Sequence, residues 1–252
     1  KPVQLRYGAT RAHNRHMAEF CSQDERLMGV GIVPLDNPAA AITELEWAID
    51  HGLESIWIPH RAPIGHSPGH VDLEGFWARL AEAGVPFVLH VGGAPLQVAK
   101  DWGNNGRGAV KDWLGGGENV RTKDAAVLHQ TPEMFISMLL LDGVFDRHPG
   151  LRGAAVELGA GWVPELCRRL DWVCRIYGRS DTSVRFDRPP SEQLQEQMGF
   201  TPFSHEHVGN LAADSAPDLY LFGSDYPHLE GTKDPIGPVS YTHLRAHETP
   251  IN

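Results

Sequence analysis

The chain has few cysteines and no excess of positive charge, and both absences limit what it can do. Its three cysteines, Cys21, Cys167 and Cys174, form no CxxC pair, so we interpret them as reduced thiols and not as a disulfide framework. The formal net charge of -10 argues against nucleic-acid or anionic-membrane partners, because both need a basic surface. We see no signal peptide and no apolar stretch long enough to cross a bilayer. We therefore expect a cytoplasmic protein.

The two ends of the chain also depart from those of an ordinary reading frame. Residue 1 is Lys1 and not Met, which suggests that the natural start lies upstream. Residues 239–249 (VSYTHLRAHET) differ in style from the preceding chain and resemble the translated sequencing-adapter tails of metagenomic reading frames. The sequence therefore predicts one domain over residues 1–238, followed by a non-native tail over residues 239–252.

What the chain does contain is an alternation of short apolar runs with helical patterns. Hydrophobic residues make up 41% of its 252 residues, which is enough for one large α/β domain. The predicted strands cover residues 27–33, 55–58, 85–91, 153–158 and 219–222, with a weaker candidate at 197–202. The predicted helices cover residues 38–51, 73–83, 132–141 and 162–177, with a weaker one at 10–23. This alternation predicts βαβ units and a parallel sheet.

Polar residues placed where strands end favour a closed barrel over an open sheet. His60, His90, Glu157 and Asp225 each follow an apolar run. In a (β/α)8 barrel all such strand ends meet at one active-site mouth, whereas in an open sheet they are strung along an edge. The chain also lacks a glycine-rich phosphate fingerprint. Because only about six strands can be counted against the eight of a full barrel, we expect a TIM barrel that lacks its first one or two βα units.

His90 and Asp225 are the strongest candidates for chemistry. Histidine and aspartate are both good ligands for zinc or manganese, and a barrel brings the two strand ends together. A metal held there could polarise a carbonyl group or activate a water molecule. Each residue also has a simpler interpretation, because His90 could be a hydrogen-bonded structural histidine and Asp225 could cap a turn.

Further candidates for the same mouth come with open alternatives. His228, three residues after Asp225, could bind substrate, support the metal site or simply lie in a turn beside Pro227. Arg11 and Asn14 could meet a substrate carboxylate, or they could serve the surface and a helix cap. Trp162 could stack on an aromatic substrate, although packing against the barrel is the simpler role.

Eight stretches make the chain resemble the amidohydrolase-related family, which includes 2-amino-3-carboxymuconate-6-semialdehyde decarboxylase and related aromatic-acid decarboxylases. They lie at residues 11–20 (RAHNRHMAEF), 26–27 (RL), 33–35 (VPL), 84–86 (GVP), 89–90 (LH), 143–151 (GVFDRHPGL), 157–164 (ELGAGWVP) and 223–228 (GSDYPH). The resemblance implies a barrel of the metal-dependent hydrolase type with one divalent metal, zinc with manganese as the alternative. It implies that His90 and Asp225 bind this metal together with a first-strand His-x-His pair, which has no match here.

The same resemblance assigns an acid/base role to the position that Glu157 occupies, where the decarboxylases have a histidine. A glutamate can exchange protons when burial raises its pKa. We therefore expect Asp225, Glu157 and His228 as catalytic residues of a metal-dependent hydrolase or non-oxidative decarboxylase acting on a small carboxylated substrate. A metal-independent lactonase-type hydrolase and an inactive barrel serving as an interaction module are the alternatives. A small molecule is the expected partner, and a homodimer is left open.

Overall fold

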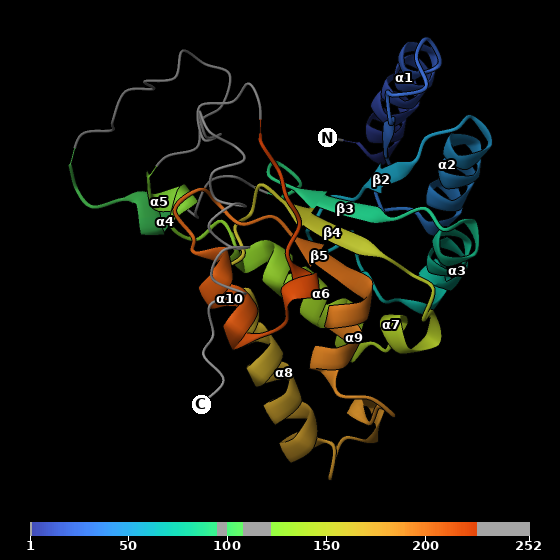
Figure 1. Ribbon diagram of the computed structural model, residues 1–252. Coiled ribbons are helices and arrows are strands. Elements are labelled where there is room, and N and C mark those ends of the chain that lie inside the picture. The colour runs from blue at the N-terminus through green and yellow to red at the C-terminus, as the bar shows by residue number, and fades with distance from the viewer. Residues whose placement is uncertain (1, 95–99, 108–121, 226–252) are drawn as a thin grey trace.

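The described strands form one parallel sheet in a computed structural model that covers residues 2–94, 100–107 and 122–225. The strands are β1 (Val30–Ile32), β2 (Ser55–Trp57), β3 (Phe87–His90), β4 (Gly153–Val156) and β5 (Met198–Phe200). They lie in the order β1-β2-β3-β4-β5, and every neighbouring pair is parallel (Figure 1). Each strand thus pairs with the next one along the chain, as in a (β/α)8 barrel and unlike a doubly wound sheet. The fold is therefore of the α/β TIM-barrel type, as the sequence predicted.

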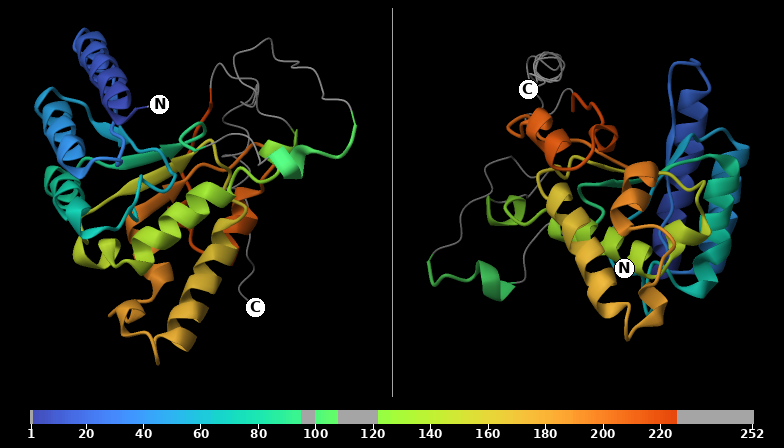
Figure 2. Two further views of the ribbon diagram at one scale, coloured as in Figure 1. Left: turned by 180° about the vertical axis from the view of Figure 1, so that it is seen from behind. Right: turned by 60° about the horizontal axis from the view of Figure 1, so that its bottom comes forward.

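The helices follow one another in an arc along the sheet, from α1 through α2 and α3 to α9 and α8 (Figures 1 and 2). They are α1 (Val3–Cys21), α2 (Pro38–Asp50), α3 (Glu74–Ala83), α4 (Lys100–Gly103), α5 (Thr122–Ala125), α6 (Gln130–Leu141), α7 (Val144–Arg147), α8 (Val163–Tyr177), α9 (Pro190–Gln197) and α10 (Val208–Asp214). Three-residue 3-10 turns lie at Val71–Leu73, Thr182–Val184 and Pro217–Leu219. In the part of the chain that is described, none of these helices has the length and apolar content that crossing a bilayer requires.

Local signals in the sequence set the ends of these helices. The Asn37 side chain accepts a hydrogen bond from the Ala40 N–H (3.1 Å) and caps α2, and Pro38 occupies its first turn. Gly84 adopts φ 65° and ends α3, a conformation that favours glycine. Asn37 is thus the cap of α2, whereas the neighbouring Asp36 makes ion pairs with Arg6 and Arg61.

The two faces of the sheet differ in how deeply they are buried. Phe87, Leu89 and Ala155 are fully buried. The ring of Phe87 meets Trp77 of α3 and Phe145 of α7, at centroid distances of 5.6 and 6.4 Å. The residues that alternate with them on β3 and β4, His90 among them, are only partly buried. Because side chains alternate along a strand, His90 projects from the face opposite the helix-packed core.

The last predicted strand, residues 219–222, is the main difference between the sequence pattern and the structure. Its apolar run begins in the 3-10 turn Pro217–Leu219, and only Tyr220 pairs, in an isolated parallel bridge with Phe200 of β5. The weaker candidate at 197–202, in contrast, is the fully buried strand β5. With the bridge at Tyr220, the described residues occupy six successive strand positions of the eight in a barrel.

Side chains of α1 cover the free edge of β1. The Asn14 amide accepts from the Ile32 N–H (2.8 Å) and donates to the Ile32 carbonyl (3.0 Å). His13 Nε2 lies 3.2 Å from the Val30 carbonyl. The second N–H of Asn14 goes to Glu44 Oε1 (3.0 Å), and Asn14 itself is fully buried. These side chains pair with backbone groups that an exposed strand edge would leave open.

We expect Asn14→Ala to lower the free energy of unfolding by about 2–4 kcal/mol, because it leaves the N–H and carbonyl groups of Ile32 without their Asn14 partner and leaves the buried Glu44 with Arg15 alone. Chemical denaturation measures this loss. The matched control is Asn210→Ala on the exposed surface of α10, which should change stability by less than about 0.5 kcal/mol. Equal effects of the two substitutions would show that the edge of β1 does not depend on Asn14.

Candidate active site

His90 and Glu157 meet at the carboxyl ends of two neighbouring strands. His90 is the last residue of β3 and pairs in register with Val156, the last residue of β4. Glu157 comes one residue later, and its Oε2 lies 2.7 Å from His90 Nε2. The Glu157 side chain is 14% exposed and that of His90 43%. The strand register therefore places an acid and a base in direct contact at the barrel mouth.

The other ring nitrogen of His90 fixes how the ring is protonated. Nδ1 lies 2.8 Å from the Val91 carbonyl oxygen, which can only accept, so Nδ1 carries a proton. In the neutral ring the lone pair is then on Nε2, the nitrogen that faces Glu157. A histidine held by a backbone carbonyl in this way is typical of metal ligands, because the second contact orients the ring and fixes its tautomer.

The surroundings of His90 favour its protonated form. The hydrogen bond to Glu157 raises the pKa of His90 above its ordinary 6.5, while burial opposes this shift. The Val91 carbonyl and the negative charge of Glu157 add to the increase, and the charge of Asp225 adds a smaller contribution of the same sign. The charge of Asp225 thus acts on His90, and the binding of one metal by these two residues stays a prediction.

Glu157 and Asp225 share an unusual backbone conformation. Among the described residues they are the only two non-glycine residues with positive φ, at 56° and 51°. This left-handed region disfavours any residue that has a Cβ atom, and such outliers cluster at functional sites. Two of the carboxylates selected from the sequence are thus held where an ordinary loop would place a glycine.

The loop after β4 is anchored by a single carboxylate, Glu206. Its oxygens accept from the backbone N–H groups of Ala160 (2.9 Å), Gly161 (2.7 Å) and Phe203 (2.7 Å). A Cβ atom at Gly161 would lie 2.7 Å from the Glu206 Oε1, so a larger residue there would displace this carboxylate. The Glu157 backbone N–H donates to Thr201 Oγ1 (3.0 Å) on the neighbouring segment. This set of contacts fixes the chain on both sides of the strained Glu157.

His60 supports His90 from the neighbouring strand end. Its Nε2 donates to the His90 carbonyl (3.0 Å), which again can only accept. Burial lowers the pKa of His60 to about 4, so the ring is neutral at pH 7. The sequence placed His60 after a strand but did not select it as a site residue. Only the pairing of β2 with β3 reveals that it carries the backbone of His90.

The other residues selected from the sequence lie as follows. Both side-chain N–H groups of Asn14 donate to protein acceptors, the Ile32 carbonyl and Glu44 Oε1. A contact between Asn14 and substrate stays a prediction. Arg11 is exposed on α1. Trp162 donates to the carbonyls of Leu158 (3.2 Å) and Gly159 (3.0 Å) and packs edge-on against Phe200, which agrees with the simpler of its two roles. His228 and the tail over 239–252 lie outside the described residues.

His90 fits a divalent metal by its chemistry, and Asp225 offers a carboxylate near it. Within the described ranges, however, no group of three or more His, Cys, Asp and Glu side chains is arranged to hold an ion. Zinc sites in proteins have three or four protein ligands. The described residues therefore do not form such a site by themselves, and metal binding by His90 and Asp225 stays a prediction.

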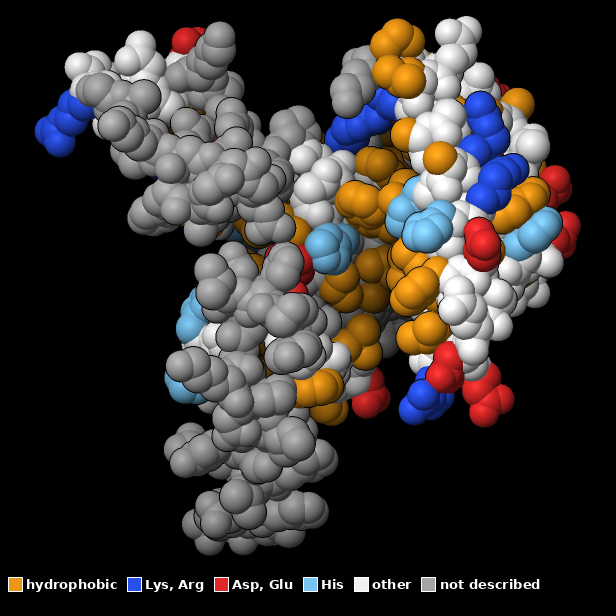
Figure 3. All heavy atoms as spheres, turned by 90° about the horizontal axis from the view of Figure 1, so that it is seen from above, with side chains coloured by type: hydrophobic (Ala, Val, Ile, Leu, Met, Phe, Trp, Pro, Cys, Tyr) orange, Lys and Arg blue, Asp and Glu red, His pale blue; other side chains and the backbone are white. Residues whose placement is uncertain are grey.

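The face above the strand ends carries the side chains expected of a site. Seen from above, histidine and acidic side chains lie next to one another beside a hollow, and hydrophobic side chains form much of its wall (Figure 3). Pockets of this composition, apolar with a few polar groups, are typical of small-molecule sites.

Comparison with known proteins agrees with this geometry. The profile of the Amidohydrolase family matches residues 2–248, and the chain belongs to this family. A gamma-resorcylate decarboxylase from Rhodococcus jostii is 29% identical over 242 residues, which cover 86% of this chain and 65% of that enzyme. The chain thus spans somewhat less than two thirds of this relative.

Two solved structures resemble the fold. An amidohydrolase from Mycobacterium avium subsp. paratuberculosis matches with a TM-score of 0.68 and 30% identity, over 86% of this chain and 52% of that one. A dihydroxybenzoic acid decarboxylase from Polaromonas, solved with manganese and the inhibitor 2-nitroresorcinol, matches with a TM-score of 0.62 and 18% identity, over 98% of this chain and 70% of that one. At that identity the second likeness concerns the fold alone.

The strain at Glu157 leads to a prediction about stability. We expect Glu157→Gly to be more stable than Glu157→Ala by about 1 kcal/mol, because glycine tolerates φ 56° and alanine does not. Urea denaturation of the two variants measures the difference. Glu46 in α2 is exposed and is the matched control. There the order should reverse, since glycine destabilises a helix relative to alanine. The same order at both positions would contradict strain at Glu157.

Proposed function

We propose that the protein is a non-oxidative decarboxylase acting on a small carboxylated aromatic acid. The contact between His90 and Glu157 at the strand ends carries this proposal. Membership of the amidohydrolase family and the likeness to gamma-resorcylate decarboxylase support it. Since the match leaves part of that enzyme uncovered, the reaction and its substrate are proposals for the whole protein.

The proposed chemistry needs a proton donor beside the ring carbon that loses its carboxylate. Decarboxylation breaks the bond between that carbon and the carboxyl group, leaves the electron pair on the ring carbon and releases CO₂. A proton must then be added to the same carbon. Glu157 lies at the mouth, with its Oε2 2.7 Å from His90 Nε2. Because His90 Nε2 carries no proton when it binds a metal, Glu157 itself is the group proposed to carry and deliver the proton, as a general acid.

A divalent metal is part of the proposal. His90 Nε2 and the Asp225 carboxylate are the described groups that would bind it, together with ligands outside the described residues. Such an ion supplies positive charge that stabilises the negative charge of the substrate. The manganese in the Polaromonas structure supports manganese as one candidate. Zinc, a role for His228, a cytoplasmic location and a homodimer remain predictions from the sequence.

Two other functions are separated from this one by simple observations. A metal-independent lactonase would hydrolyse esters of the same size after treatment with a chelator. A protein that serves only as an interaction module would turn over neither these esters nor a carboxylated aromatic acid.

The direct test is incubation with Mn²⁺ and gamma-resorcylate in D₂O, with release of CO₂ and deuterium on the ring measured together. We expect one deuterium at the carbon that lost its carboxylate. Glu157→Gln should lower kcat by about 100-fold or more, the usual loss on removal of a general acid. The control is Glu196→Gln, an exposed change near the end of α9 that should leave kcat unchanged.

Full activity of Glu157→Gln would rule out Glu157 as the proton donor. Ester hydrolysis without metal, in the absence of CO₂ release, would favour the lactonase. No reaction with any carboxylated aromatic acid, from protein shown to be folded and loaded with metal, would favour the interaction module.

A further inference from the structure

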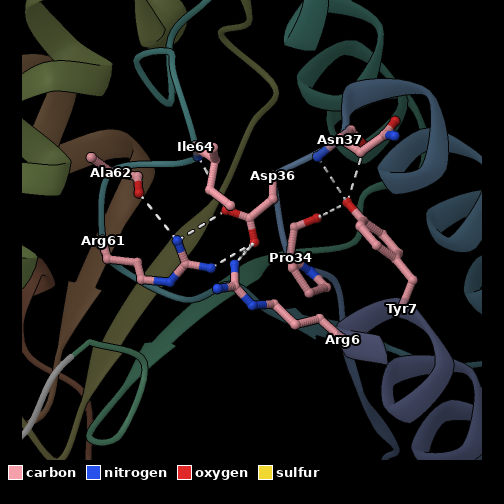
Figure 4. A network of polar contacts seen from close by, with 8 residues as sticks. All are labelled: Arg6, Tyr7, Pro34, Asp36, Asn37, Arg61, Ala62 and Ile64. Carbon is pink, nitrogen blue, oxygen red and sulfur yellow. Dashed lines mark hydrogen bonds and ion pairs between the residues drawn. The ribbon is translucent and has the colours of Figure 1, made fainter. Parts of the chain in front are cut away.

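A buried carboxylate holds two arginines beside the same mouth. Asp36 lies in the loop after β1, and its side chain is inaccessible to solvent. Its Oδ2 accepts from Arg6 of α1 (2.7 Å) and from Arg61, which follows β2 (2.6 Å). Its Oδ1 accepts from Arg61 (3.0 Å) and from the Ile64 backbone N–H (3.1 Å). Figure 4 shows the two guanidinium groups converging on this carboxylate.

This cluster has one positive charge in excess. Burial opposes ionisation of Asp36, but the hydrogen bonds from Arg61 and Arg6 outweigh it and hold the pKa of Asp36 below its ordinary value. Burial raises the pKa of the adjacent Tyr7 to about 12, so its hydroxyl is neutral and donates to the Pro34 carbonyl. Among the described residues, two guanidinium cations therefore face one carboxylate.

The arginines have hydrogen-bond donors to spare. A guanidinium has five N–H groups. Arg6 donates one hydrogen bond to a described acceptor, the Asp36 carboxylate. The Arg6 and Arg61 side chains remain 30% and 28% exposed. Asp36 thus fixes both side chains in place while each stays partly exposed, and their remaining N–H groups can bind a second anion.

The cluster lies on the catalytic side of the sheet. Asp36 and Arg61 both follow the carboxyl ends of their strands, β1 and β2. His60, the residue before Arg61, donates to the His90 carbonyl. Since neighbouring strands lie about 4.8 Å apart, one to two strand spacings place the cluster about 5–10 Å from His90 along the mouth. That separation matches a small substrate that carries a second anionic group.

We propose that Arg6 and Arg61, positioned by Asp36, form an anion subsite for a second carboxylate of the substrate, at the end opposite the reacting one. The substrate class is thus an aromatic acid with two carboxylates. The assignment of the reacting end rests on the proposed function, but the binding of an anion to the arginines does not. Replacing one of the two arginines by a neutral residue removes the excess positive charge and some of the N–H donors of the subsite.

Binding of three probes to the full chain tests this subsite without turnover. Isothermal titration compares benzene-1,3-dicarboxylate, benzoate and inorganic phosphate. We expect the dicarboxylate to bind about 10-fold or more tighter than benzoate, the effect of a hydrogen-bonded charge pair. Arg6→Gln should abolish this difference. The control Arg26→Gln, an exposed arginine paired with Asp24, should retain it.

Arg6→Lys covers the case in which Arg6→Gln does not fold. This substitution keeps the positive charge but loses the planar guanidinium group with its paired donors. The preference for the dicarboxylate should therefore fall but not vanish. Equal affinity of the wild-type protein for the two acids, or a preference that survives in Arg6→Gln, would overturn the subsite. Phosphate binding as tightly as the dicarboxylate would assign the arginines to a free inorganic anion and overturn the substrate assignment.

Discussion

The register between β3 and β4 is the constraint on which the site depends. Because His90 pairs with Val156, the next residue, Glu157, comes within 2.7 Å of the His90 ring. A shift of one residue would turn the side chains of a strand to the opposite face of the sheet and separate this pair. The buried side chains on the other face, with Phe87 packed against α3 and α7, oppose such a shift. Core packing thereby fixes the contact between these two side chains.

The rest of the mouth is built to hold this contact. His60 binds the backbone of His90, and Glu206 binds the loop that follows Glu157. These contacts explain how Glu157 stays in a left-handed conformation that disfavours it. On the other side of the mouth, Asp36 ties α1 and the loops after β1 and β2 together through its two arginines. The strands supply positions, and a small number of buried polar groups hold the functional side chains there.

The sequence predicted the fold well because strand period, caps and helix length are local signals. It also selected Glu157, His90 and Asp225, because polar residues after apolar runs collect at one end of a parallel sheet. It did not select His60, Arg61 or Asp36, whose contacts join segments that are distant in sequence. The apolar run at 219–222 looked like a full strand, yet only Tyr220 pairs. Whether an apolar run such as 219–222 forms a strand depends on pairing with a segment that is distant in sequence, which a local pattern does not show.

The most direct measurement is the titration of the His90 ring by NMR in the metal-free protein. The proton shared with Glu157 should give His90 a pKa above 6.5. In Glu157→Gln the pKa should fall, because the hydrogen bond to a charged partner is lost and burial still disfavours the cation. An unchanged pKa of His90 in Glu157→Gln would show that the two side chains do not share a proton and would contradict the account.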